Sequence, residues 1–215
     1  MERKKIKQKL EEWFEIYKEK SIGNIDYKFD QTASTQEIQS LEQKLKENLP
    51  AEIKTFFFSV SREIYLNVDF NNNVSFGKDG KVSSAYIALS LNGVYDAECS
   101  RKKWVEEVFF DTGDDYSKKW HNKFGIMSLI NGDIIAMDLE KQVHPIIYLS
   151  HDDGEGHGYI LGRSFEEYLK SIVEIGGCGT EDEEFLQFCT DNISGIDLKC
   201  TNIIQLREKL RLGKM

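Results

Sequence analysis

The spacing of hydrophobic residues in this chain changes twice, and this change constrains the fold more than any other feature. Over residues 4–20 and 34–57, apolar side chains recur every three or four positions, as on one face of a helix. From Ile64 to Phe70 they alternate with mostly polar residues, as in a half-buried strand. After residue 164 the helical spacing returns. Helices, then strands, then helices predict an α+β domain.

Local signals set the boundaries that we expect. Ser34-Thr35-Gln36-Glu37 and Ser164-Phe165-Glu166-Glu167 have the pattern of a capping box, in which the hydroxyl and the carboxylate each accept a backbone N–H at the helix start. Pro50 suits the first turn of a helix. Gly23-Asn24 is expected to end the first helix, and Asn71-Asn72-Asn73 to form a turn.

The middle of the chain predicts strands joined by short turns. Asn131-Gly132 is a strong hairpin signal, because both residues tolerate positive φ. The expected strands are 64–70, 74–76, 82–89, 126–129, 134–139, 143–150 and 159–161, and the other expected helices are 101–110, 164–173, 181–189 and 202–212, with a loop over 111–122.

We expect a single domain over residues 1–215. Its core spans about 24–175, preceded by an N-terminal helix over 1–23 and followed by a helical extension over 176–215. The sequence contains no internal repeat and no low-complexity linker that would divide it.

The net charge of −9 is unevenly distributed. Fourteen acidic and three basic residues lie between Asn131 and Asp191, giving −11, while the rest of the chain carries +2. This balance argues against a general nucleic-acid binder, since phosphate binding needs clustered Lys and Arg, and against docking on anionic membranes. The acidic segment is either an ordinary solvated surface or a surface for a basic partner.

Other features indicate a cytoplasmic protein. No run of about 18 apolar residues could span a bilayer. The basic start is followed by Glu11 and Glu12 instead of an apolar signal-peptide core. Four scattered cysteines form no CxxC pair and no disulfide framework, so we expect them to be reduced and mostly packed as small apolar groups.

The loop from His151 to Gly158 attracts attention as a ligand site. Its glycines do not form a dinucleotide loop, because a strand is expected to follow instead of a helix. His144, His151 and His157 have no zinc-type spacing, and the acids do not fit a calcium loop. A solvated loop is the favoured interpretation, and metal binding there stays open.

A nucleophilic site is not evident either. The chain has no G-x-S-x-G motif and no cysteine in a recognisable catalytic context. Carboxylates are abundant, but any acidic chain contains potential acid–base pairs. We therefore predict a protein that is not an enzyme and that uses no cofactor.

Three blocks together resemble the SMI1/KNR4 family, the SUKH-1 branch of the SUKH superfamily. The first is Ser34–Glu42 followed by Leu49–Phe56, similar to the family's opening helix, "LP" and short helix. The second is the hairpin Phe124–Leu139. The third is Pro145–Asp152 followed by Ser164–Leu169, similar to the family's final strand, His-Asp and Ser-Phe-x-x-Tyr/Phe-Leu helix. One departure is Ser59–Arg62, where the family often has Asn-Gly.

The resemblance covers roughly residues 30–173 and implies an α+β fold with a mixed or antiparallel sheet flanked by helices. The stretches before and after it are additional helices. It also implies protein binding without catalysis. Bacterial members are often immunity proteins that neutralise a cognate polymorphic toxin, commonly a nuclease, whereas fungal members are linked to cell-wall synthesis and its regulation.

Two binding functions therefore compete. The first is an immunity protein whose acidic segment binds a basic toxin domain, for which the candidate contacts are Asp152, Asp153, Glu155, Glu181, Asp182, Glu183 and Glu184. The second is a regulatory scaffold that binds an endogenous partner, such as cell-wall synthesis or signalling machinery. An enzyme or metal protein that uses the His151–His157 loop is the third hypothesis.

Overall fold

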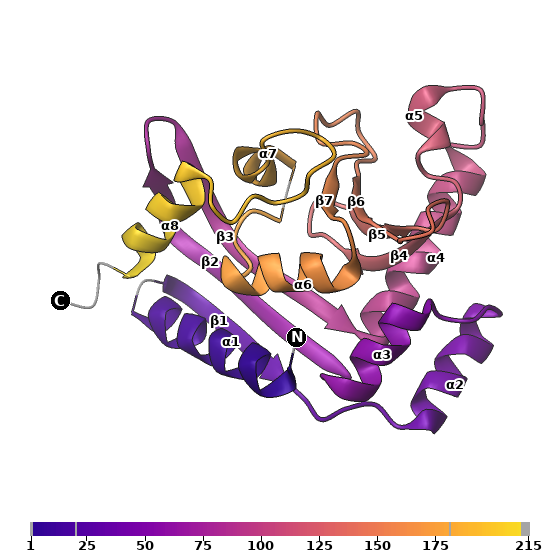
Figure 1. Ribbon diagram of the computed structural model, residues 1–215, viewed down its shortest axis with the longest axis horizontal. Helices are drawn as coiled ribbons and strands as arrows, with labels where there is room; N and C mark the ends of the chain where they lie inside the picture. Colours follow the sequence, from indigo (N-terminus) through magenta and orange to yellow (C-terminus); the bar gives the residue numbers. More distant parts are fainter. Residues whose placement is uncertain (1, 20, 181, 212–215) are drawn as a thin grey trace.

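The computed structural model describes residues 2–19, 21–180 and 182–211 and shows an α+β fold with two antiparallel sheets (Figure 1). The fold class predicted from the sequence is confirmed. In Figure 1 the first sheet runs diagonally across the molecule, and the second stands beside it between α6 and α4. The helices are α1 (Arg3–Lys18), α2 (Thr35–Leu45), α3 (Ala51–Ser59), α4 (Leu91–Glu107), α5 (Asp115–Lys118), α6 (Phe165–Glu174), α7 (Asp182–Phe185), the 3-10 helix η1 (Leu186–Phe188) and α8 (Thr201–Arg211).

The first sheet has the strand order β1-β2-β3, with β1 (Ser21–Phe29), β2 (Glu63–Phe76) and β3 (Gly80–Ser90). Ile64, Leu66 and Val68 are fully buried, as their alternation predicts. The expected turn at residues 71–73 is wrong, because β2 continues through the asparagines. The register with β3 shifts between Asp69 and Val74, so the irregularity is absorbed as a bulge within the hairpin.

The second sheet has the order β4-β5-β6-β7, with β4 (Lys123–Ser128), β5 (Ile134–Asp138), β6 (Ile146–Leu149) and β7 (Ile160–Gly162). Every residue of β5 and β6 is buried, so these strands lie inside the molecule with both faces covered. The hairpin predicted at Asn131-Gly132 joins β4 to β5, and Gly132 adopts a φ of +96° there.

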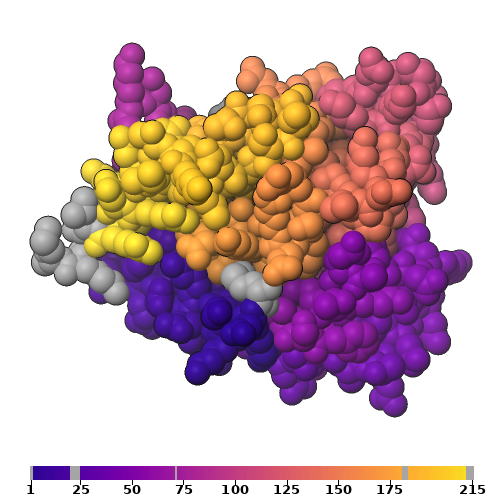
Figure 2. Space-filling view, in the orientation of Figure 1, coloured from indigo at the N-terminus to yellow at the C-terminus, as the bar shows by residue number. Residues whose placement is uncertain are grey.

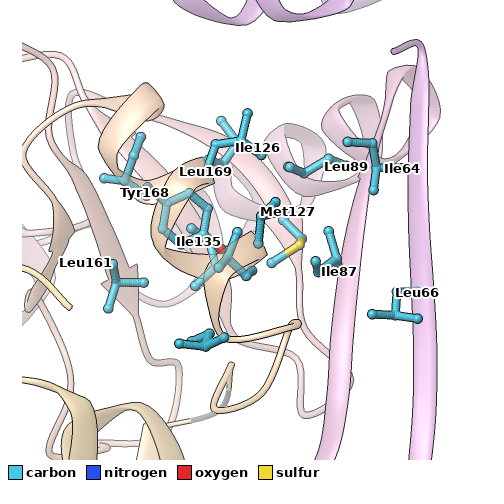
Figure 3. Packing of buried hydrophobic residues seen from close by; sticks show 14 of the residues in the cluster. Ile64, Leu66, Ile87, Leu89, Ile126, Met127, Ile135, Leu161, Tyr168 and Leu169 are labelled. Carbon is cyan, nitrogen blue, oxygen red and sulfur yellow. The ribbon is translucent and has the colours of Figure 1, made fainter. Parts of the chain in front are cut away.

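The main hydrophobic core lies between the sheets and under α6. Figure 3 shows side chains of β2, β3, β4, β5 and α6 converging there, among them Leu66, Ile87, Met127, Ile135 and Tyr168. A smaller cluster covers the other face of the second sheet. Its members come from α4, the segment after it, and strands β5 and β6: Ala97, Phe109, Trp120, Ile134, Ala136, Ile147 and Leu149.

The N-terminal helix is part of the core. The Trp13 indole donates to the Val173 carbonyl at 3.0 Å, and the Tyr17 hydroxyl donates to the Gly176 carbonyl at 2.8 Å. At the other end of the chain, α8 packs on β2 through Leu206 and its buried neighbours. Figure 2 shows the C-terminal residues, in yellow, lying against α6, while the tip of the β2–β3 hairpin stands out from the body.

The helix caps are partly as predicted. Ser34 forms the complete capping box with Glu37. At α6, Ser164 caps the Glu167 N–H, but the Glu167 carboxylate accepts the N–H of Arg163 instead of that of Ser164. The second box is therefore only half formed, because the carboxylate also pairs with the Arg163 guanidinium at 3.0 Å. Pro50 occupies the N-cap position, one residue before the expected first turn.

Several element boundaries differ from the expectation. The N-terminal helix ends at Lys18, and a strand that the sequence did not predict begins at Ser21. The helix expected over 101–110 begins ten residues earlier, at Leu91, where the Ser90 side chain caps the Gly93 N–H. The loop over 111–122 contains α5, and the helix expected over 181–189 is α7 followed by η1. Within the described ranges, no helix is both long and apolar enough to span a bilayer.

Candidate functional site

The loop after β6 presents three of the candidate carboxylates to solvent. Ser150 anchors the loop: its hydroxyl donates to Asp152 Oδ1 at 2.8 Å and accepts the Gly154 N–H at 3.1 Å. The Asp153 N–H donates to the Tyr116 hydroxyl at 3.0 Å. Asp152, Asp153 and Glu155 are exposed, so their carboxylates can meet a partner.

The histidine at the end of the same loop points inward. His157 Nδ1 accepts the Ser150 N–H at 3.1 Å, so the ring proton lies on Nε2, which donates to the Tyr116 carbonyl at 3.0 Å. The imidazole also stacks on the Tyr116 ring, with centroids 3.7 Å apart. Burial lowers the pKa of His157 to about 4. Both ring nitrogens are engaged, so His157 fastens the loop and offers no lone pair to a metal.

Asp133 joins the β4–β5 turn to this loop. Its Oδ1 accepts the backbone N–H of His151 at 2.9 Å and His151 Nδ1 at 2.6 Å. Its Oδ2 accepts the Asn131 amide at 2.7 Å and the Tyr148 hydroxyl. Asp133 is 1 % exposed, and four donors compensate its burial. It therefore contributes negative charge to its surroundings but has no spare acceptor site.

The residues with metal-ligand spacing in the described structure are Asp133, His151 and Asp152, whose ligand atoms lie within 4.8 Å of one another. A metal would have to replace the hydrogen bond between His151 and Asp133. His144 lies elsewhere, with Nδ1 3.0 Å from Glu52 Oε1, and His157 is fully engaged. The arrangement favours a hydrogen-bonded cluster that shapes the loop over a metal site.

The Glu184 side chain, on α7, is buried against β3 and does not lie on the exposed surface. It is 8 % exposed. Its Oε1 accepts two hydrogen bonds from Ser83 on β3, from the backbone N–H at 2.6 Å and from the hydroxyl at 2.7 Å. Its Oε2 is buried and has no hydrogen-bond partner among the described residues. The side chain is therefore anchored at one oxygen and unsatisfied at the other.

These carboxylates share one cleft of about 860 Å³. Figure 1 shows α7 between the β2–β3 hairpin on one side and strands β6 and β7 on the other. The lining residues carry five carboxylates and one ammonium group, that of Lys81, for a formal charge of −4. They are Asn73, Lys81, Ser83, Asn131, Asp133, Asp152, Asp153, Gly154, Glu155, Glu184, Leu186 and Gln187.

Four of the seven candidate contacts are thus brought together, three of them at the exposed rim and Glu184 in the wall. Glu181 lies outside the described residues. Asp182 and Glu183 form the start of α7, and the structure describes only their backbone.

The sequence did not single out the residues that close this cleft. Gln187 ties η1 to β3, because its side-chain oxygen accepts the Lys81 N–H at 2.9 Å and its amide donates to the Lys81 carbonyl at 3.0 Å. Ser83 holds Glu184 in the same way. These contacts join residues about a hundred positions apart, and no local pattern signals them.

A second groove, of about 580 Å³, lies between α2 and the part of the first sheet where β2 begins and β3 ends. Its Arg62 is already paired with Asp30 and Glu37, both at 2.9 Å. Hydrogen bonds from neighbouring backbone groups, and then from the Ser34 hydroxyl and the Arg62 guanidinium, hold the pKa of these two carboxyls below the usual range. Because these charges compensate one another, this groove favours no charged ligand.

Cys178 and Cys189 offer no nucleophile of low pKa. All four cysteines are free. Cys178 is buried against the Tyr17 hydroxyl, and burial raises the pKa of its thiol to about 12. Burial raises the pKa of the half-buried Cys189 to about 12 as well. Such thiols remain protonated near neutral pH, so they are weak nucleophiles.

Comparisons with known proteins agree with this architecture. A comparison with curated proteins finds no match for this chain. The family model described as SMI1 / KNR4 family (SUKH-1) matches residues 32–171, about two thirds of the chain, from the loop before α2 to within α6. The matched region contains both sheets except β1, and the resemblance seen in the capped helix, the hairpin and the His-Asp loop is confirmed. The chain belongs to the SMI1/KNR4 family of the SUKH-1 type.

Proposed function

We propose that this chain is a cytoplasmic, non-catalytic immunity protein that neutralises a cognate toxin by binding it, and that the toxin is a nuclease with a basic surface. Members of the family are known for immunity-like and protein-binding roles. The observation that carries the proposal is the acidic cleft, in which five carboxylates from three separate segments surround one cavity.

Electrostatics gives the reason for a nuclease. An enzyme that cleaves nucleic acid needs a positively charged cleft to hold phosphates. An acidic surface of complementary shape can occupy such a cleft. Opposite charges then speed the encounter and disfavour wrong partners. Asp152, Asp153 and Glu155 are exposed at the rim of the cleft, where they can act at long range.

The direct test is co-expression of the chain with a candidate toxin domain taken from the genes that adjoin its own. The chain should restore growth and co-purify with the toxin. The double variant Asp152→Lys/Asp153→Lys should weaken binding about tenfold or more at low salt and reduce its salt dependence, because two attractive charges become repulsive.

Glu106→Lys/Glu107→Lys is a matched control, since it reverses two adjacent exposed acids on α4, away from the cleft. This control should bind as the wild type does. Unchanged affinity and salt dependence in the loop variant would remove the loop from the interface. A toxin that kills equally with and without the chain would contradict the immunity function, and recovery of an endogenous protein in its place would favour a regulatory scaffold.

A further inference from the structure

We infer that the groove between α6 and the segment before α8 binds a phosphate group, through the Ser171 hydroxyl at its floor and the ammonium groups of Lys170 and Lys199 at its rim. The groove has a volume of about 390 Å³. It shares no lining residue with the acidic cleft, so the inference goes beyond the proposed function and does not depend on it.

The groove has two walls, which come from separate parts of the chain. Lys170 and Ser171 follow Glu167 by three and four positions, so the three side chains share one face of α6. Residues 190–199, which lead from η1 to α8, form the other wall. Figure 2 shows this part of the chain, in yellow, lying against α6. A ligand in the groove can therefore meet groups from both walls.

The Ser171 hydroxyl is the polar group at the floor of the groove. Ser171 is 3 % exposed, and its hydroxyl makes no hydrogen bond with a described residue. A serine or threonine in a helix often donates to the carbonyl four residues earlier, as Thr55 and Ser59 do in α3. Ser171 does not, and its oxygen is not one of the buried atoms that solvent cannot reach. The hydroxyl therefore has a donor to offer to a ligand in the groove.

The two lysines at the rim supply positive charge that no carboxylate neutralises at contact distance. Lys170 and Lys199 are exposed, and neither forms an ion pair with a described residue. The Glu167 carboxylate is already paired with the Arg163 guanidinium, at 3.0, 3.1 and 3.3 Å. Asp197, the other acid of the lining, accepts the Lys199 backbone N–H at 2.9 Å. Three cations and two acids give the lining a formal charge of +1, although the chain as a whole carries −9.

A phosphate group matches these donors better than a carboxylate does. It carries about −1.5 to −2 charges at pH 7 and three strong acceptor oxygens, so it can accept from the hydroxyl and from both ammonium groups at once. Lysine binds phosphate as a point charge with three rotatable donors. A carboxylate is matched best by the planar fork of an arginine, and Arg163 already uses its fork on Glu167.

The site can be tested on the full chain with inorganic phosphate as the probe. Titration into ¹⁵N-labelled protein, at an ionic strength kept constant with sodium chloride, should shift the backbone amide signals of Ser171, Ser194 and Lys199. The expected Kd is about 1–10 mM. Sodium acetate should bind about fivefold more weakly, because it has less charge and fewer acceptors.

Methyl phosphate distinguishes two sources of the group. Binding at least as tight as that of inorganic phosphate would indicate that the natural ligand is a phosphorylated molecule. Binding of inorganic phosphate alone would indicate the free ion. Both results support a phosphate site.

The decisive variant is Lys170→Gln/Lys199→Gln, which removes both rim charges and should weaken phosphate binding about tenfold or more. Ser171→Ala removes one hydroxyl donor and should weaken it about threefold. The matched control is Lys118→Gln/Lys141→Gln, which removes two exposed lysines outside the groove and should bind phosphate as the wild type does. The spectrum of each variant without phosphate shows whether the fold is retained.

Equal phosphate binding by the wild type and by Lys170→Gln/Lys199→Gln would overturn the inference. Equal affinity for acetate would overturn it too, as would signal shifts at lysines outside the groove as large as those within it. These outcomes are distinct from failure of the proposed function, because toxin binding is tested through other residues. A groove that fails to bind phosphate leaves the immunity function as it stands, and a toxin that is not neutralised leaves the phosphate site.

Discussion

Two buried glutamates, Glu98 and Glu184, differ in how completely their carboxylate oxygens are hydrogen-bonded. Glu98, on α4, is 1 % exposed, and both of its oxygens are paired. Arg101 donates to Oε2 at 2.8 Å and to Oε1 at 2.7 Å, and the Gly125 N–H donates to Oε2 at 2.7 Å. Lys102 adds a third charge contact at 3.5 Å. This carboxylate receives all its donors from within the chain.

Glu184 is buried almost as deeply but has donors at one oxygen only, both from Ser83. The two sites also differ in their surroundings. Glu98 lies where α4 packs on β4, in the interior, whereas Glu184 lines an acidic cleft. The difference separates two roles for a buried charge. A fully paired carboxylate fixes the packing of two elements, whereas a half-paired one keeps the desolvation cost of its unpaired oxygen.

The largest expected effect comes from Glu98→Ala, which should destabilise the fold by about 3–5 kcal/mol. The change leaves the Arg101 guanidinium buried without its counter-charge and the Gly125 N–H without its acceptor. Urea unfolding at pH 7 measures the loss. Glu106→Ala, at an exposed position of the same helix, should cost less than about 0.5 kcal/mol. If the free energies of unfolding of the two variants differ by less than about 1 kcal/mol, the structural role assigned to Glu98 is wrong.

The comparison also requires that the loop after β6, which His157 fastens, stays folded. The pH dependence of the free energy of unfolding tests this, because His157 is buried. Burial lowers its pKa from 6.5 to about 4 in the folded protein. Between these values the unfolded chain binds a proton that the folded chain does not, so stability falls as the pH falls from 6.5 to 4 and is fully present above 6.5. The loss amounts to about 3 kcal/mol.

The measurement compares free energies of unfolding at pH 7 and pH 4.5 for the wild type and for His157→Gln. The variant should be less stable at pH 7 and should lose less stability on acidification. His144→Gln, near the surface beside Glu52, controls for the removal of a histidine from the chain. An unchanged slope in His157→Gln would mean that another group governs the acid sensitivity.

Gly125→Ala sharpens the comparison by separating packing from charge at the Glu98 site. A Cβ at residue 125 would lie 2.6 Å from the Ala97 carbonyl oxygen, which belongs to the backbone of α4. The helix would have to move away from β4, and we expect a loss of about 1–3 kcal/mol in urea unfolding. Gly113→Ala, where only the mobile end of Asp111 lies near, should cost less than about 0.5 kcal/mol. Equal costs would show that α4 can shift without strain.

The sequence could predict the parts of this fold that local chemistry decides. The Ser34 capping box, the Asn131-Gly132 hairpin and the alternation from Ile64 to Val68 each depend on neighbouring residues, and the structure has all three. The strand Ser21–Phe29 was missed because Gly23-Asn24 is typical of a helix end. Its pairing with β2, forty residues away, overrides that local signal.

The candidate site shows the same limit. Asp152, Asp153 and Glu155 were expected at the surface and are exposed, because a Gly-rich loop between strands seldom has another place to lie. Glu184 was expected to be a surface contact with them. Its burial depends on the adjacent Phe185, which is 1 % exposed and draws α7 into the core, and on Ser83 from a hairpin a hundred residues earlier. The local spacing of hydrophobic residues predicts neither of these contacts.

The smallest effect on stability is also the one that most directly tests the comparison. Glu184→Gln keeps the acceptor for both Ser83 donors and exchanges an unpaired charged oxygen for an unpaired neutral amide. We expect a change within about 1 kcal/mol of zero, or a slight gain, because a neutral polar group costs less to bury than a charge. Glu98→Gln keeps the same shape but weakens two bonds to Arg101, and should cost about 1.5–3 kcal/mol. Urea unfolding of the matched pair decides between the roles. A loss at Glu184 as large as that at Glu98 would show that its carboxylate also holds the fold together, and the contrast between the two sites would be wrong.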